Sequence, residues 1–238
     1  NDTATTEIYT LSLHDALPIW SFNFQISPSL MAKALNEVYP EALLSVNYQL
    51  SSAMFCKIDN MEITDEMIAN VKARMQEIIN QNLEIRKVVM TKEEAEEFYS
   101  NEKTLRGIVQ IDNTQKEGVS LYYCEDYFNY FFGVMPVTTA YTDVFDVIKY
   151  GDGFLVRYPS AEKPNELTNY KSNKKLLSTL EEYEDIHRVL QIDTLYKLNK
   201  EIKEGRTSNV ILLSEALHEK KMANIADDIA KRKNVKMV

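Results

Sequence analysis

The feature that most constrains the fold is a change in hydrophobic period along the chain. Before residue 159, short alternating runs typical of half-buried strands are interleaved with helical patterns. Beyond residue 173, only the three-and-four spacing of amphipathic helices remains. The polar segment between them contains Pro159 and Pro164, which is typical of a connection at a domain edge. The sequence therefore predicts an α+β fold, with helices packed on a mainly antiparallel sheet, followed by a helical C-terminal segment.

Capping signals mark the starts of the expected helices. Ser27 and Pro28 match the cap and the first position of one helix, and Thr64 precedes the apolar pattern of a second. Thr91 and Glu94 match the capping box of a short acidic helix. The first two of these helices are expected at residues 27–38 and 64–80. The periodicity predicts three further helices, at residues 176–190, 193–204 and 208–233.

Seven runs rich in β-branched and aromatic residues are expected to be strands. A short polar break joins the first two into a hairpin, and Gly151-Asp-Gly153 predicts the tight turn of another. Residues 101–117 are weakly patterned. The expected strands are residues 43–49, 52–59, 83–90, 119–124, 127–132, 144–149 and 154–158.

The charge balance disfavours strong nucleic-acid binding. The 238 residues carry 27 Lys and Arg against 36 Asp and Glu, a net charge of −9, and an acidic surface repels phosphate backbones. The two cysteines, Cys56 and Cys124, are too few for a disulfide framework or a four-thiolate zinc site. No run approaches the roughly 18 apolar residues that a membrane span needs. We therefore expect a cytoplasmic protein with no membrane partner.

Residues 1–19 differ in origin from the rest of the chain. Their sequence, NDTATTEIYTLSLHDALPI, looks like the in-frame translation of a sequencing adapter, with Trp20 resuming the natural sequence. We expect this segment to take no part in the fold, and we expect the chain to be a fragment of a longer protein. Without Asp2, Glu7 and Asp15 the net charge is −6, which leaves the charge argument unchanged.

Few residues of the natural sequence suit catalysis. His187 and His218 lie on expected helices among charged residues, without a metal-ligand partner four residues on, so we expect both to be solvated. The pattern Gly151-Asp-Gly153 lacks the third glycine of a dinucleotide-binding loop. No Walker A sequence for ATP phosphates occurs in the chain.

An aromatic cluster at residues 122–132 has two interpretations. Exposed rings beside a positive groove could stack on bases, but strand alternation turns about half of them inward and no basic groove accompanies them. Core packing is the expected role. The short basic segment at residues 171–175 is expected to be a solvated linker rather than a phosphate site.

Two stretches of the first part follow the order of a known type of domain. Residues 29–99 carry SLMAKALNEVYPEA, a hairpin, and ITDEMIANVKARMQEIINQNLEIRKVVMTKEEAEEFY, and this order resembles the second additional, editing-type domain of threonyl-tRNA synthetases. The run FNYFFGVMPVTTAY, followed by FDVIKYGDGFLVRYP, is similar to the second signature of that domain. The resemblance implies a hydrolytic pocket with two histidines four residues apart on the first helix, and a cysteine and a histidine four apart on a later loop.

The positions that the resemblance assigns to this pocket hold other residues here. Gln25 and Ser29 occupy the two helix positions, Phe131 the cysteine position and Met135 the loop histidine position, and Gly133 belongs to the pocket-forming loop. Ser29 without a base can neither activate water nor stabilise an oxyanion. We therefore expect a vestigial pocket with no catalytic residue and no metal, whose candidate binding residues are Gln25, Ser29, Phe131, Gly133 and Met135.

The last part, SNVILLSEALHEKKMANIADDIAKRKNVKMV, is similar to a junction in bacterial uridine kinase-like nucleoside kinases. In that family the helix runs into the first strand of a P-loop kinase domain. The resemblance implies that such a domain follows residue 238, that residues 235–238 are its first strand, and that its sheet covers the apolar stripe of the helix. ATP, Mg²⁺ and a nucleoside would bind there, with no cofactor in residues 1–238.

The expected division is therefore an adapter at 1–19, an editing-like accessory domain at 20–160, a linker and helix at 161–190, and a helical junction at 191–238. The expected function is the non-catalytic N-terminal accessory part of an ATP-dependent nucleoside kinase. Two alternatives remain open. One is a regulatory module that binds a ligand or an RNA end, and the other is an aminoacyl-tRNA editing hydrolase, which the acidic charge disfavours.

Overall fold

The computed structural model describes residues 20–101, 111, 118–131, 133–160, 162–169, 174–192 and 194–232. The chain divides into two compact units, one formed by Asn1–Glu94 and Glu117–Tyr170 and the other by Ala95–Lys116 and Lys171–Val238. The expectations stated for residues 1–19 and 235–238 and for nearly all of 101–117 fall outside the described residues.

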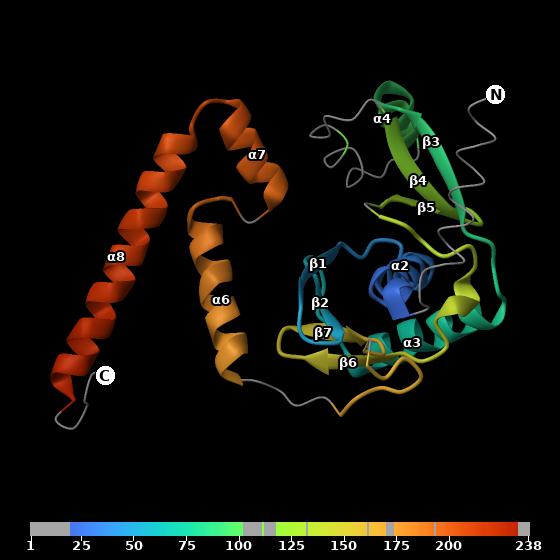
Figure 1. Ribbon diagram of the computed structural model, residues 1–238, viewed down its shortest axis with the longest axis horizontal. Coiled ribbons are helices and arrows are strands. Elements are labelled where there is room, and N and C mark those ends of the chain that lie inside the picture. Colours follow the sequence, from blue (N-terminus) through green and yellow to red (C-terminus); the bar gives the residue numbers. More distant parts are fainter. Residues whose placement is uncertain are drawn as a thin grey trace. The chain divides into compact units, whose positions relative to one another are not determined.

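The strands of the first unit form two antiparallel sheets (Figure 1). The larger has the order β1-β2-β7-β6 and consists of Leu44–Gln49, Ala53–Ile58, Gly153–Arg157 and Asp146–Tyr150. The smaller has the order β3-β4-β5 and consists of Arg86–Thr91, Gly118–Cys124 and Tyr127–Tyr130. The predicted hairpins β1-β2 and β6-β7 are both confirmed, and Gly151 in the second turn has a φ of 60°.

Two helices pack against each other beside the larger sheet. Helix α2, Trp20–Val38, contacts β7 and β2, and helix α3, Asp65–Asn80, contacts β6. All six apolar residues of the α3 pattern are buried, as the periodicity predicts. They are Met67, Ile68, Val71, Met75, Ile78 and Ile79.

Two of the three predicted helix N-caps are present. The Thr64 hydroxyl accepts a hydrogen bond from the Met67 N–H at 3.1 Å and so caps α3. At the next helix, α4 (Lys92–Asn101), the Thr91 hydroxyl accepts from the Glu94 N–H while the Glu94 carboxylate accepts from the Thr91 N–H. This reciprocal pair is the capping box that the sequence predicts.

The predicted start of α2 is wrong. The helix begins at Trp20 rather than after Ser27, and Pro28 lies inside it. Ser27 is buried, and its hydroxyl hydrogen-bonds the Thr142 hydroxyl at 3.4 Å instead of capping the helix. Ile26, one turn before Leu30, is fully buried, so burial of the preceding turn favours helix there despite the proline.

The third strand begins three residues later than predicted. Residues 83–85 instead hydrogen-bond to the segment that connects β5 to β6. The Leu83 N–H donates to the Thr139 hydroxyl at 2.9 Å, and the Ile85 N–H donates to the Val137 carbonyl at 2.8 Å. Thr139 opens a short 3₁₀ helix, Thr139–Tyr141, and its hydroxyl donates to the Ile78 carbonyl. This tie holds the chain before β3 against α3.

The described C-terminal part of the second unit is helical, as predicted. It comprises α6 (Lys174–Val189), α7 (Leu195–Lys203) and α8 (Thr207–Lys231). The α+β fold class with a helical C-terminal segment is therefore confirmed. Among the described residues, no helix is both long enough and apolar enough to cross a membrane.

A candidate ligand-binding recess

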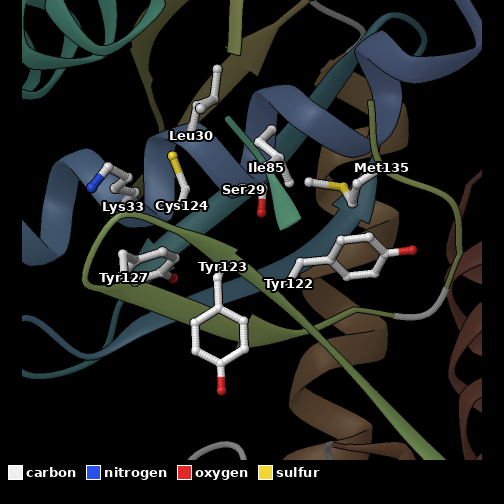
Figure 2. A pocket seen from close by; sticks show the side chains of 9 residues that line it. All are labelled: Ser29, Leu30, Lys33, Ile85, Tyr122, Tyr123, Cys124, Tyr127 and Met135. Carbon is white, nitrogen blue, oxygen red and sulfur yellow. The ribbon is translucent and has the colours of Figure 1, made fainter. Parts of the chain in front are cut away.

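A small recess with a cavity volume of about 20 Å³, partly open to solvent, lies in the first unit between α2 and the β4-β5 hairpin. Figure 2 shows Ser29 between Cys124 on one side and Ile85 and Met135 on the other, whereas Tyr123 points away from them. The full lining consists of Ser29, Leu30, Lys33, Ile85, Tyr122, Tyr123, Cys124, Tyr127 and Met135.

Helix α2 supplies the polar side of the recess. Ser29 and Lys33 are four residues apart and therefore lie on one face of the helix, one turn from each other. Leu30 and Met31, which are buried, anchor the helix in the core cluster. The recess thus combines a hydroxyl and an ammonium group with apolar walls.

Lys33 is a buried cation with two carboxylate partners. Its side chain is 3% exposed, and its Nζ lies 2.6 Å from a Glu37 carboxylate oxygen and 3.3 Å from a Glu125 carboxylate oxygen. Burial alone would lower the pKa of Lys33, but the hydrogen bond and charge of Glu37, with a further hydrogen bond to Glu125, raise it above its ordinary value. Lys33 therefore remains protonated at neutral pH.

Glu37 links the recess to α3. Its second carboxylate oxygen accepts from Arg74 Nε at 2.6 Å, and Arg74 also pairs with Glu77 at 2.7 Å. Partial burial would raise the pKa of Glu37, but hydrogen bonds from Lys33 and Arg74 lower it overall. The chain of charges from Lys33 to Glu77 alternates in sign, which holds the Lys33 head group in place.

Strand β4 supplies the opposite wall. Tyr122 and Cys124, two residues apart, both belong to the buried core cluster. Burial raises the pKa of the Cys124 thiol, and the charge of Lys33 opposes this effect without reversing it. Glu125 follows at a φ of 54°, in the turn that brings its carboxylate to Lys33.

Tyr122 joins the recess to the loop after β5. Its hydroxyl donates to the Gly133 carbonyl at 2.7 Å, and its ring meets the Phe131 ring edge-on with the centroids 6.4 Å apart. Burial raises the pKa of Tyr122 despite a backbone hydrogen bond from Met135. Gly133 has a φ of 143°, which glycine adopts readily.

The structure brings most of the predicted binding residues to this recess. Ser29 and Met135 line it, and Phe131 and Gly133 contact Tyr122 of its wall. Gln25 lies one turn before Ser29 in α2, and its side chain is outside the described part of the chain. The assignment of a binding role to these residues stays a prediction.

Sequence reasoning found only two of the lining residues, Ser29 and Met135, and missed the others, among them Lys33, Ile85 and Cys124. Lys33 could have been found, because it continues the four-residue spacing from Gln25 through Ser29 along one helix face. The placement of Ile85 and Cys124 depends on the pairing of β3 with β4 and on contacts with the loop after β5. No local pattern encodes those contacts.

The histidines and most of the aromatic cluster, the other candidates from the sequence, lie outside the recess or pack against neighbouring side chains. His187 and His218 are exposed on α6 and α8, as predicted. Of the aromatic cluster, Tyr122 is buried, and Tyr123 stacks on Phe128 with centroids 5.6 Å apart. Within the described ranges, no group of three or more His, Cys, Asp or Glu could hold a metal ion.

Comparison with known proteins finds partial sequence similarity to threonine–tRNA ligases. No protein-family model matches it. It is 27% identical to the threonine–tRNA ligase of Clostridium acetobutylicum over 95 residues, which cover 40% of this chain and 15% of that protein. It is 25% identical to the enzyme of Lactococcus lactis over 124 residues (51% and 19%), and 24% identical to that of Streptococcus pneumoniae over 144 residues (60% and 22%).

The chain thus spans about a fifth of the length of the curated relatives it matches. The similarity is low and partial, and it agrees with the resemblance found in the sequence. Together with the α+β fold, it shows that this chain contains a domain similar to part of the threonyl-tRNA synthetases.

Proposed function

We propose that the first unit is a binding domain, whose recess holds a small ligand and does not hydrolyse it. The support is the surroundings of the polar groups: two carboxylates hold the Lys33 ammonium, and burial raises the pKa of Cys124 and of Tyr122. A general base or a thiolate nucleophile must instead be deprotonated near neutral pH. Ser29 therefore has no activating partner among these three groups.

The chemistry of the lining suits an uncharged nucleoside better than a ligand that carries a phosphate. The charge of Lys33 is already matched by Glu37 and Glu125, so no net positive charge is left for a phosphate group. Tyr122, Tyr127 and the apolar side chains offer flat and apolar surface to a base, and Ser29 offers a hydroxyl to a sugar. The cavity volume of about 20 Å³ is far below the roughly 300–1,000 Å³ of enclosed ligand pockets, so the recess would contact part of a ligand rather than enclose it.

Saturation-transfer NMR with the full chain tests this proposal. We expect transfer to uridine and weaker transfer to uridine monophosphate, because the phosphate would meet two carboxylates. Ser29→Leu fills part of the recess and should abolish transfer to uridine. Ser178→Leu, the same change at an exposed helical serine, is the matched control and should leave it unchanged. The proposal is contradicted by no transfer to uridine, or by equal transfer in the Ser29→Leu variant.

We also propose that the intact protein is an ATP-dependent nucleoside kinase, in which this chain is the accessory part. The support is the resemblance of residues 208–238 to the kinase junction, and α8 is one continuous helix over Thr207–Lys231. ATP and Mg²⁺ would act in the kinase domain that follows. Sequencing the gene beyond the Val238 codon should reveal a P-loop, G-x-x-x-x-G-K-[ST], within a few residues. An in-frame continuation without one would overturn this second proposal and leave the first intact.

Hydrolysis of aminoacyl-tRNA is a third candidate function. It is favoured by the similarity to threonine–tRNA ligases and by Ser29 and Lys33 lying on one helix face. Such an activity would require Lys33 to lose a proton that its carboxylate partners help it to keep.

A further inference from the structure

Helix α8 leaves many of its apolar side chains exposed. None of its residues, all of which lie in the described part of the chain, is buried. Ile211, Met222 and Ile225 are 51%, 56% and 47% exposed. A helix of 25 residues is about 37 Å long, so this is an extended surface rather than an isolated residue.

The exposed residues follow a regular seam. Starting at Ile211, positions spaced alternately by four and three residues are Ile211, Glu215, His218, Met222, Ile225 and Ile229. Four of the six are apolar, and this spacing is that of helices that pair along their length. We name these six residues the α8 seam.

The chain itself uses a neighbouring face of α8. Lys221 pairs with Glu182 of α6, and its ammonium lies 5.4 Å from the centroid of the Tyr183 ring. Val210, Ser214 and Leu217, at the same spacing as Lys221, are also half-buried. The contact with α6 therefore occupies one face and leaves most of the α8 seam beside it exposed.

We propose that a second copy of this chain, in place of the kinase sheet that the sequence resemblance implies, covers the α8 seam, with the two α8 helices antiparallel. The charge distribution selects this occupant and this orientation. The half of α8 up to Glu219 carries Glu215 and Glu219 and neither Lys nor Arg, whereas residues 220–232 carry four basic and two acidic side chains. Antiparallel pairing places the acidic half against the basic half, while parallel pairing places like charges together.

A twofold axis through His218, near the middle of the seam, brings two of its isoleucines together. Ile211 and Ile225 each lie seven residues from His218, so a twofold axis through His218 places Ile211 of one copy opposite Ile225 of the other. A symmetric pair thus covers both isoleucines.

Analytical ultracentrifugation of the full chain tests the proposal. We expect a dimer at tens of micromolar, converted to a monomer by Ile211→Glu with Ile225→Glu. Ala223→Glu with Ala230→Glu adds the same charge to another face of the helix and should remain dimeric. Circular dichroism of each variant must show the same helix content as the wild-type chain, because a loss of the dimer is informative only if the monomer is folded. Ile211→Ala with Ile225→Ala, which keeps helix propensity, should weaken the dimer at least tenfold.

Cross-linking determines the orientation. A cysteine at position 218 (His218→Cys) should form an intermolecular disulfide under mild oxidation. One at position 209 (Asn209→Cys) should not, because antiparallel pairing separates its two copies by about 27 Å. Cross-linking at 209 but not at 218 would contradict the antiparallel pair. The proposal would be overturned if the wild-type chain were monomeric at 100 micromolar, even if another protein were later found to bind α8.

Discussion

Lys33 is the residue on which the local electrostatics of the recess depend. Its buried ammonium is stable only because Glu37 and Glu125 accept two of its hydrogen bonds. The same partners keep the group charged and remove it as a base.

We therefore expect substitution of Glu37 to destabilise the fold more than substitution of Lys33. Glu37→Gln leaves the buried Lys33 ammonium with Glu125 alone and should lower the free energy of unfolding by about 1–3 kcal/mol. Lys33→Met removes the cation and leaves carboxylates that water reaches, so it should cost less. Urea denaturation of both variants and of the double variant measures this. Equal or reversed costs would mean that Lys33 is not held chiefly by Glu37.

A second residue-scale prediction concerns alkaline pH. Burial raises the pKa of the Cys56 thiol from 9.0 to about 12. The unfolded chain releases this proton near pH 9, whereas the folded chain keeps it, so rising pH favours unfolding. The shift corresponds to roughly 4 kcal/mol lost between pH 9 and 12.

Cys56→Ala should therefore flatten the loss of stability over this pH range, as measured by urea denaturation at several pH values. Cys124→Ala is the companion variant, because it leaves Cys56 in place and should retain most of the slope. An unchanged slope in Cys56→Ala would show that the Cys56 thiol does not titrate as its burial requires.

At the scale of elements, the β6-β7 hairpin depends on two glycines for different reasons. A Cβ at Gly153 would lie 2.4 Å from the Cys56 carbonyl oxygen and 2.7 Å from the Phe55 ring, whereas one at Gly151 would meet nothing within 4 Å. Gly151 instead needs its φ of 60°.

Gly151→Ala should therefore cost about 1 kcal/mol, the usual penalty for a left-handed residue. Gly153→Ala should cost clearly more, about 2–4 kcal/mol, because β2 and β7 must separate. Thermal or urea unfolding of the two variants compares them directly. A Gly153→Ala variant as stable as Gly151→Ala would contradict the close approach of these strands.

The elements show where local sequence determines structure. In α3 the spacing of Met67, Val71, Met75 and Ile78 defines a single apolar stripe, and Thr64 gives the start, so both could be predicted. In α2 the proline signal indicated a start that tertiary burial of Ile26 overrides. A local signal predicts a boundary only when no packing interaction competes with it.

At the scale of the whole molecule, the α+β character and the helical C-terminal part follow from the hydrophobic periods. The sheet order β1-β2-β7-β6 does not, because it pairs strands about a hundred residues apart, as in Cys56 opposite Phe154. For the same reason, the full lining of the recess could not be predicted from the sequence. Ser29 and Met135 could be assigned through a resemblance, but the wall formed by Ile85 and Cys124 arises only from long-range pairing.

The central claim is that the recess binds a ligand without hydrolysing it. The most direct test is the rate of aminoacyl-tRNA deacylation by the full chain, measured beside a protein-free control and the Ser29→Ala variant. The account predicts the same rate in all three, because Lys33 and Cys124 remain protonated and leave Ser29 without an activating group. Hydrolysis above the protein-free rate that Ser29→Ala abolishes would contradict it and establish the recess as an active site.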